Sequence, residues 1–347
     1  MSIAPIAPIG PAAMALRVQV IGAVESELMA AVDAAQEQPA LAPDTRPATP
    51  PAPPLPNPAR QAVDVARADA AGRQASLAPL FANLAEAQDA PALPPAIKTA
   101  IGRLLALQTP LSGQITAQIV QQAIAQSGLF LEAHLAKTGG RQPAPPDIKA
   151  ALLTLQRALA AEPPAEAPAG TRPMPTPPPV REAGLTPQAA ALATLSARDE
   201  APVIVQHLAA QVDQAVARQT LHQLASLPDG APPTWMFELP VATPQGTAVA
   251  QFQIDRDGQG STSSEASQAW RVRFSIDIEP LGPVHVHLRM DGDAAAVTVW
   301  AEREDGLERL RSMGAELSQS LPGEVTFHPG APRRPPPESG QFVDRAL

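Results

Sequence analysis

The chain of 347 residues contains no cysteine. Disulfide bonds, thiolate metal sites and thiol-based catalysis are therefore excluded, although this absence does not identify the compartment in which the protein works. Aromatic residues are also scarce, at 3% of the chain, and all three tryptophans lie between positions 235 and 300. A packed core is therefore expected in the C-terminal part of the sequence.

A basic surface and a long apolar run are missing too. The formal net charge is −9, so no nucleic acid partner is expected. No stretch approaches about 18 uninterrupted apolar residues, so no membrane insertion is predicted. The N-terminal stretch has no basic leading region and carries Arg17 in its apolar part, which fits a cleavable signal peptide poorly. We expect a soluble protein made in the cytoplasm.

The motifs of common enzyme classes are absent as well. The sequence has no Ser-His-Asp signature, no glycine-rich phosphate loop and no His-Glu-x-x-His pattern. Four aspartates in predicted turns are interpreted as turn and capping residues: Asp255, Asp257, Asp291 and Asp293. We therefore predict a non-enzymatic protein that uses no cofactor.

His285 and His287 have the spacing of a metal-binding pair, because residues two apart on a strand point to the same side. A site would need a third ligand, for which only His328 and nearby carboxylates such as Asp277 or Glu279 are available. We interpret the two histidines as polar residues on a solvated sheet face and predict no metal site. An enzyme that uses this face is a third hypothesis, which metal analysis of the purified protein would test.

Proline is abundant, and its distribution divides the chain. Of the 43 prolines, 33 precede Thr234, and such runs do not fit regular helices or central strands. The densest runs, at 39–58 and 163–180, predict extended spacers. Five regions are predicted: a disordered Pro/Ala-rich region at 1–93, a small helical region at 94–160, a Pro-rich linker at 161–200, a C-terminal α+β domain at 201–329 and a disordered tail at 330–347.

Apolar residues recur at helical spacing in several segments before the C-terminal domain. Short amphipathic helices are predicted between positions 95 and 160, and Asp147 is expected to cap one of them. Because such helices are not stable alone in water, they should pack together as a small bundle. Further helices are predicted at 14–35, at 62–87 and at 201–227, and the last should dock beside the C-terminal sheet.

Between residues 235 and 290 apolar residues alternate with polar ones, which is typical of strands with one buried face. The apolar residues form four rows, and the rows are Trp235, Phe237, Leu239 and Val241; Ala248, Ala250, Phe252 and Ile254; Val272, Phe274, Ile276 and Ile278; and Val284, Val286, Leu288 and Met290. The intervening polar residues should line a solvated face. Short turns between the rows predict an antiparallel meander.

A fifth strand is predicted at 294–302. The period then becomes that of a helix, because spaced leucines from Leu307 to Leu321 fall on one stripe. A short strand at 325–327 would return to an edge of the sheet, and the helix should cover the apolar face. The predicted fold class is α+β: a small C-terminal antiparallel sheet covered by helices, preceded by a largely disordered Pro/Ala-rich region that contains a small helical bundle.

Trp300 fits the alternation least well. If its neighbours Val297 and Val299 point into the core, Trp300 lies on the polar face, where either the 201–227 helix covers it or it marks a partner surface. Cover by the helix is the expectation. The residues predicted to contribute to a partner surface are Leu281, Gly282, Trp300 and Arg309, although the turn at the first two is interpreted as mainly structural.

The segment from Phe274 to Leu288, with the residues that follow it, resembles the C-terminal domain of the flagellar hook-length control protein family. The matching features are the Leu281-Gly282 turn, the aliphatic strand Val284 to Leu288, the hairpin Asp291 to Asp293, Ala301-Glu302 and the leucine-striped helix. The stretch from Ser127 to Gly140, SGLFLEAHLAKTGG, also resembles a segment upstream of that domain in some members.

The resemblance implies a non-enzymatic protein that is exported through the flagellar type III apparatus. It implies that the N-terminal part measures hook length, with hook and hook-cap subunits as partners. The C-terminal domain would bind the cytoplasmic domain of the export-gate switch protein and change export from hook to filament subunits. A monomer is expected.

The composition suits this role, because a chain that threads a narrow channel should lack disulfides and have long unstructured stretches. The residues before the sheet could span about 750 Å fully extended, or about 350 Å as a helix. The alternative from another class is an envelope-binding adaptor with Pro-rich spacer arms. A cleavable signal or an anchor would favour that alternative, and neither is visible in the sequence.

Overall fold

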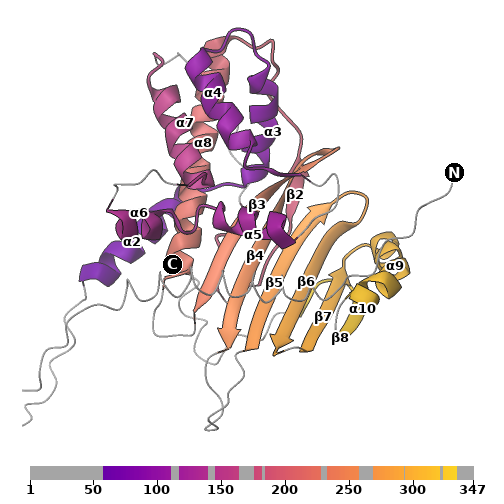
Figure 1. The fold of residues 1–347 in the computed structure, drawn as a ribbon. Coiled ribbons are helices and arrows are strands. Elements are labelled where there is room, and N and C mark those ends of the chain that lie inside the picture. Colours follow the sequence, from indigo (N-terminus) through magenta and orange to yellow (C-terminus); the bar gives the residue numbers. More distant parts are fainter. Residues whose placement is uncertain are drawn as a thin grey trace, which may run out of the picture.

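The computed structural model describes residues 58–110, 117–139, 145–163, 176–181, 184–227, 233–257, 269–292, 294–320 and 323–333 (Figure 1). Everything predicted before residue 58, including the helix at 14–35, lies outside the described residues, as does the tail after residue 333. Within the described part, a mixed sheet is flanked by helices. The predicted α+β class is confirmed.

Across the described residues, eight strands form one sheet in the order β1-β3-β4-β5-β6-β7-β8, with β2 paired to β4. The strands are β1 Thr109–Pro110, β2 Gln188–Ala191, β3 Thr234–Thr243, β4 Gly246–Asp257, β5 Ala269–Ile278, β6 Gly282–Asp291, β7 Ala294–Ala301 and β8 Gly323–Pro329. Strands β3 to β7 form the predicted antiparallel meander. The sheet is mixed rather than wholly antiparallel, because β1 runs parallel to β3 and β8 runs parallel to β7.

The strand register confirms the predicted alternation. Phe237 lies opposite Phe252, which lies opposite Phe274, and neighbouring rings stack with centroids 5.1 and 5.5 Å apart. The same row continues through Val286 to Val299. These residues lie on one side of the sheet, called the apolar face below. The other side, the polar face, carries the intervening residues of each strand.

The helices gather mainly at the β3 end of the sheet (Figure 1). They are α2 Pro58–Arg73, α3 Leu77–Gln88, α4 Pro95–Leu105, α5 Ala117–Ala125, α6 Leu131–Thr138, α7 Ile148–Ala160, α8 Ala201–Ala225, α9 Glu304–Ser312 and α10 Gly314–Ser320. Helices α3, α4, α7 and the first half of α8 share one apolar core. Asp147 caps α7 as predicted, since its carboxylate accepts a hydrogen bond from the Ala150 amide at 3.0 Å.

This helical core joins segments that the sequence assigned to different regions. Leu84, Leu155 and Leu208 are all fully buried in it, although the expected boundaries at 93, 160 and 200 separate them. The buried Asn83 side chain also accepts a hydrogen bond from the Leu195 amide at 2.9 Å and donates one to Gln211 Oε1 at 3.1 Å. Residues 58–93, expected to be largely disordered, thus contain two helices, because α3 packs on the distant α8 and β4 as well as on the neighbouring α4.

The C-terminal end departs from prediction in one respect. The helix expected at 305–321 is two helices, α9 and α10, which meet at Met313. The predicted edge strand is present as β8 and is longer than expected. Its first residue must be small, because a Cβ at Gly323 would lie 1.5 Å from the Ala295 carbonyl oxygen.

Candidate partner-binding surfaces

An apolar groove of about 660 Å³ runs along the apolar face over β5, β6 and β7. Its floor is lined by Val272, Phe274, Ile276, Ile278, Val284, Val286, Leu288, Val297 and Val299. Along one side, Leu310, Met313 and Glu316 of the α9–α10 pair and Phe327 of β8 form a wall. Most of the floor side chains on β5 and β6, among them Val286 and Leu288, are only half-buried.

The same face is closed at its other end. Trp235, Phe237, Leu239 and Ile254 of β3 and β4 are each at most 8% exposed, because Ala123 and Ile124 of α5 and the following Leu129 and Phe130 pack on them. Leu129 and Phe130 belong to the 127–140 stretch singled out in the sequence. The groove therefore lies between α5 and the α9–α10 pair, and Figure 1 shows where these helices stand relative to the sheet.

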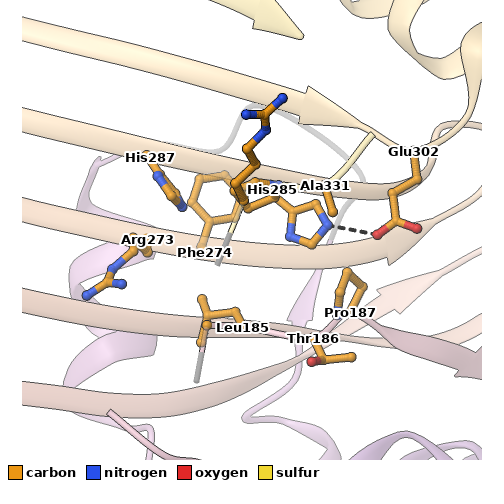
Figure 2. A pocket seen from close by; sticks show the side chains of 12 residues that line it. Leu185, Thr186, Pro187, Arg273, Phe274, His285, His287, Glu302 and Ala331 are labelled. Atoms are coloured by element: carbon orange, nitrogen blue, oxygen red, sulfur yellow. Dashed lines mark hydrogen bonds and ion pairs between the residues drawn. The ribbon is translucent and has the colours of Figure 1, made fainter. Parts of the chain in front are cut away.

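A smaller cleft, of about 170 Å³, lies on the polar face (Figure 2). Figure 2 shows that strand residues Arg273, His285 and His287 face a segment that contains Leu185, Thr186 and Pro187. His285 is 4% exposed, and its Nε2 lies 2.9 Å from Glu302 Oε1. The cleft is thus small, lined by both polar and apolar side chains, and partly filled by its own internal contacts.

Two basic side chains in this cleft, His287 and Arg273, are respectively uncharged and paired. Burial, together with the nearby Arg273 and His285, lowers the pKa of His287 to about 4. His287 is therefore uncharged near neutral pH. Arg273 Nη2 donates a hydrogen bond to Asp255 Oδ2 at 2.6 Å, which pairs the guanidinium within the sheet.

The structure does not assemble the hypothetical metal site. His285 and His287 lie on one face as the spacing requires, but His285 contacts Glu302, and His328 stacks on Trp300 at 5.8 Å. Glu279 instead accepts hydrogen bonds from Arg303 at 2.9 and 3.0 Å. Among the residues that the structure describes, no group of three His, Asp or Glu side chains is placed to hold a metal ion.

Trp300 does lie on the polar face, but the helix expected to cover it does not. Helix α8 packs on β3, whereas Trp300 is on β7, half-buried between two histidine rings. The centroid of its ring is 4.6 Å from that of His287 and 5.8 Å from that of His328. The expectation of helix cover was wrong because α8 is held at β3 by a buried ion pair, which the alternation pattern does not reveal.

That ion pair is the most deeply buried polar contact between the helices and the sheet. Arg218 of α8 and Glu238 of β3 are 1% and 0% exposed, and Nη2 lies 2.6 Å from Oε1. Burial raises the pKa of Glu238, but Arg218 and His222 lower it more strongly, so the net pKa is well below its usual range. Arg218 Nη1 also donates to Gln74 Oε1 at 2.9 Å and to the Pro177 carbonyl at 2.6 Å.

The Leu281-Gly282 turn is fixed against the start of α9. Gly282 has φ +71°, and a Cβ on it would lie 2.3 Å from Arg303 Cδ. A Cβ on Gly306 would likewise lie 2.1 Å from the Leu281 carbonyl oxygen. These close approaches explain why glycine occupies both positions, and they agree with the interpretation of the turn as structural.

The four predicted partner-surface residues do not form one surface. Leu281 lines the apolar groove, and Arg309 is exposed on α9, which forms the wall of that groove. Gly282 is buried in the turn, and Trp300 lies on the opposite face of the sheet. What sequence reasoning missed is the groove itself. A signal was available, because five strands span about 19 Å and one helix, about 10 Å in diameter, cannot cover them.

An α+β domain with an open apolar groove, and without a metal-binding cluster among its described residues, has the features of a protein-binding module. Residues 258–324, about a fifth of the chain, match the family model described as flagellar hook-length control protein FliK. The match confirms the resemblance for this segment. It includes β5, β6, β7 and the α9–α10 pair, which are the floor and one wall of the groove.

Searches of curated proteins and of solved structures found no significant match to this chain. None of the helices in the described residues combines the length and apolar character needed to cross a bilayer. The family assignment therefore rests on the matched segment.

Proposed function

We propose that this protein controls flagellar hook length and switches type III export from hook to filament subunits. The observation that carries the proposal is the family match over residues 258–324, which coincides with the groove. In this role the C-terminal domain binds the cytoplasmic domain of the export-gate switch protein. The protein acts by binding, without catalysis or a cofactor.

The groove supplies a suitable binding surface. Its apolar floor is wide enough to bury several side chains of a partner, and removal of apolar surface from water is the main driving force of such association. We therefore place the partner contact in the groove rather than in the polar cleft, which is smaller and internally paired.

The residues before the sheet would act as the measuring segment and contact hook and hook-cap subunits during export. The absence of cysteine and the proline-rich runs support passage through a narrow channel. Export through the flagellar apparatus follows from the same proposal, and the chain would need no cleavable signal for it.

The first test is a deletion strain, examined by electron microscopy of hooks together with an assay for filament protein. Overlong hooks without filaments are expected. Removal of part of the 163–180 run should shorten hooks in an otherwise intact gene, since this run would form part of the measuring segment. Normal hooks and filaments in the deletion strain would rule out the control role and favour the envelope-adaptor alternative.

A binding experiment tests the site. Titration calorimetry of the purified chain with the cytoplasmic domain of the gate protein should show that Leu288→Asp weakens binding by about tenfold or more, since a charge is placed in a desolvated contact. The matched control is Arg289→Asp at the next position, which points to the polar face and is exposed. Equal weakening by both variants would exclude the groove as the contact.

A further inference from the structure

Helix α5 lies over the β3–β4 half of the apolar face, but its own side chains are poorly buried (Figure 1). None of the residues 118–125 is buried, and Val120 is 37% exposed. The longer α7, by contrast, buries Ile148, Leu152, Leu155 and Leu159. Because segments with few buried apolar contacts are the first parts of a fold to open, we expect α5 to be held less stably than the helical core.

The chain is firmly anchored directly after α5. The Gln126 carbonyl accepts a hydrogen bond from the Ile148 amide at 2.9 Å. The Gly128 carbonyl accepts one from Gln223 Nε2, also at 2.9 Å, and Ser127 between them is 0% exposed. These contacts hold the residues after α5 against α7 and α8, so a movement of α5 would pivot at residues 125–126.

The surface beneath α5 is continuous with the open groove. Ala123 and Ile124 of α5 pack on the buried cluster of β3 and β4, and Phe252 packs at the border of the same cluster. The Phe252 ring stacks on that of Phe274 with centroids 5.5 Å apart, and Phe274 lines the groove floor. Displacement of α5 would therefore enlarge the groove rather than create a separate site.

The closed position of α5 is nevertheless the favoured one in water. It keeps the apolar side chains of Trp235, Phe237 and Leu239 away from solvent, which is the main driving force for packing. A helix of nine residues is also not stable alone in water. The open form is thus a minor state, of the kind that a partner selects by binding to it more tightly.

We propose that α5 is a lid, which opens without unfolding of the helical core and uncovers part of the β3–β4 half of the apolar face. Leu129 and Phe130 follow the pivot and stay packed on the sheet, so the uncovered part is the surface beneath Ala123 and Ile124. A partner bound in the groove would gain this additional apolar contact when the lid opens. That consequence rests on the proposed function, whereas the opening of the lid does not.

Thiol labelling of the full chain tests the lid. Because the chain has no cysteine, Leu239→Cys places a single reporter in the cluster beneath α5, and Ala100→Cys places one in the helical core. The first thiol should react with a small maleimide at least about tenfold faster than the second, with little dependence on urea below the unfolding transition, since local opening exposes little surface.

Two charge substitutions on α5 sharpen the test. Ile124→Asp on the sheet side should speed labelling of Leu239→Cys by about tenfold, because it raises the open fraction. The matched control, Gln122→Asp, places the same charge at an exposed position of the same helix and should leave the rate unchanged. Neither substitution should alter labelling of Ala100→Cys, which reports opening of the helical core.

Equal rates and equal urea dependences at the two reporter sites would overturn the proposal, since α5 would then open only with the whole fold. Equal acceleration of both sites by Ile124→Asp would overturn it as well. If thermal unfolding shows that Leu239→Cys is not folded, Ile254→Cys in the same cluster serves as the reporter with the same expectation. The readout needs no flagellar component, so normal hooks in the deletion strain would remove the proposed function and leave the lid result unaffected.

Discussion

The two halves of the sheet are covered very differently. In the β3–β4 half both faces are closed: Phe237 on the apolar face and Glu238 on the polar face are each 0% exposed. In the β5–β7 half, Val286 and Leu288 on the apolar face remain half-buried. A glutamate is thus more deeply buried than a leucine three strands away.

This contrast shows what an alternating pattern can and cannot predict. Alternation determines the side of the sheet to which a residue points. Whether a strand side chain is buried depends on segments that are distant in sequence. Arg218 of α8 buries Glu238, and α5 buries Phe237. A charged residue can be fully buried when it is paired, and an apolar row can remain open when none of the described helices packs on it.

The largest effect is expected from breaking the ion pair of the closed half. Arg218→Ala should lower the free energy of unfolding by about 3–5 kcal/mol, because it leaves the Glu238 carboxylate buried without its main partner. Urea unfolding followed by circular dichroism measures the change. The double variant Arg218→Met with Glu238→Leu removes both charges and should lose far less. An equal loss in the double variant would show that packing, not the unpaired charge, is responsible.

Truncations on the apolar face sharpen the contrast between the halves. Phe237→Ala should cost about 3–5 kcal/mol, as expected for a buried aromatic side chain. Leu288→Ala should cost about 1–2 kcal/mol, because its side chain already contacts water. Matched urea titrations test the difference, and equal losses would contradict an open groove.

A substitution at Asp147 tests the helices that pack at the closed β3–β4 half of the sheet. It lies beside the segment that follows α5, where the Ile148 amide donates to the Gln126 carbonyl at 2.9 Å. Burial raises the pKa of Asp147 to about 6, so the folded protein resists ionisation of this carboxyl group. The free energy of unfolding therefore falls as pH rises from about 4 through 6. Asp147→Asn keeps a capping side chain and should add about 1–3 kcal/mol at pH 7.

Chemical denaturation at pH 7 and at pH 4 checks this prediction. The gain should be much smaller at pH 4, where the carboxyl group is protonated in the folded protein. A gain of the same size at both pH values would mean that the buried charge is not its cause.

The smallest effect concerns the polar face of the open half. Because the pKa of His287 is lowered to about 4, the unfolded chain binds a proton that the folded chain does not bind between about pH 6.5 and 4. The contribution of this histidine to stability is therefore present above that window and lost as pH falls through it. His287→Gln should reduce the pH dependence by about 1 kcal/mol or less, as measured by thermal unfolding at pH 7 and pH 5. An unchanged pH dependence would contradict the assignment.

Much of the C-terminal fold follows from local sequence. The rows from Phe237 to Val286, the helical stripe after residue 304 and the return of β8 all depend on residue spacing within one element. The cap at Asp147 is equally local. The break at Met313 and the parallel β8 were harder to predict, because they depend on how closely Gly314 and Gly323 approach neighbouring segments.

The candidate site was less accessible to prediction. Leu281 was proposed for a partner surface and does line the groove, but Trp300 was proposed with it and lies on the other face. The groove is present because none of the described helices packs over the apolar side of β5 and β6. The residue pattern within a single strand or helix does not contain this information. The burial of Arg218 likewise depends on contacts with Gln74 and Pro177, which come from other segments of the chain.

The contact between Gln74 and Arg218 also has a consequence in time. The two residues are 144 positions apart, so this part of the fold cannot close until most of the chain has left the ribosome. At roughly 5–20 residues per second, synthesis of that stretch takes on the order of 10 s. Closing contacts so far apart is slow even afterwards. A newly made chain thus has an interval of at least seconds in which its first half is still without its final partners. Under the proposed function, export would have to begin during that interval.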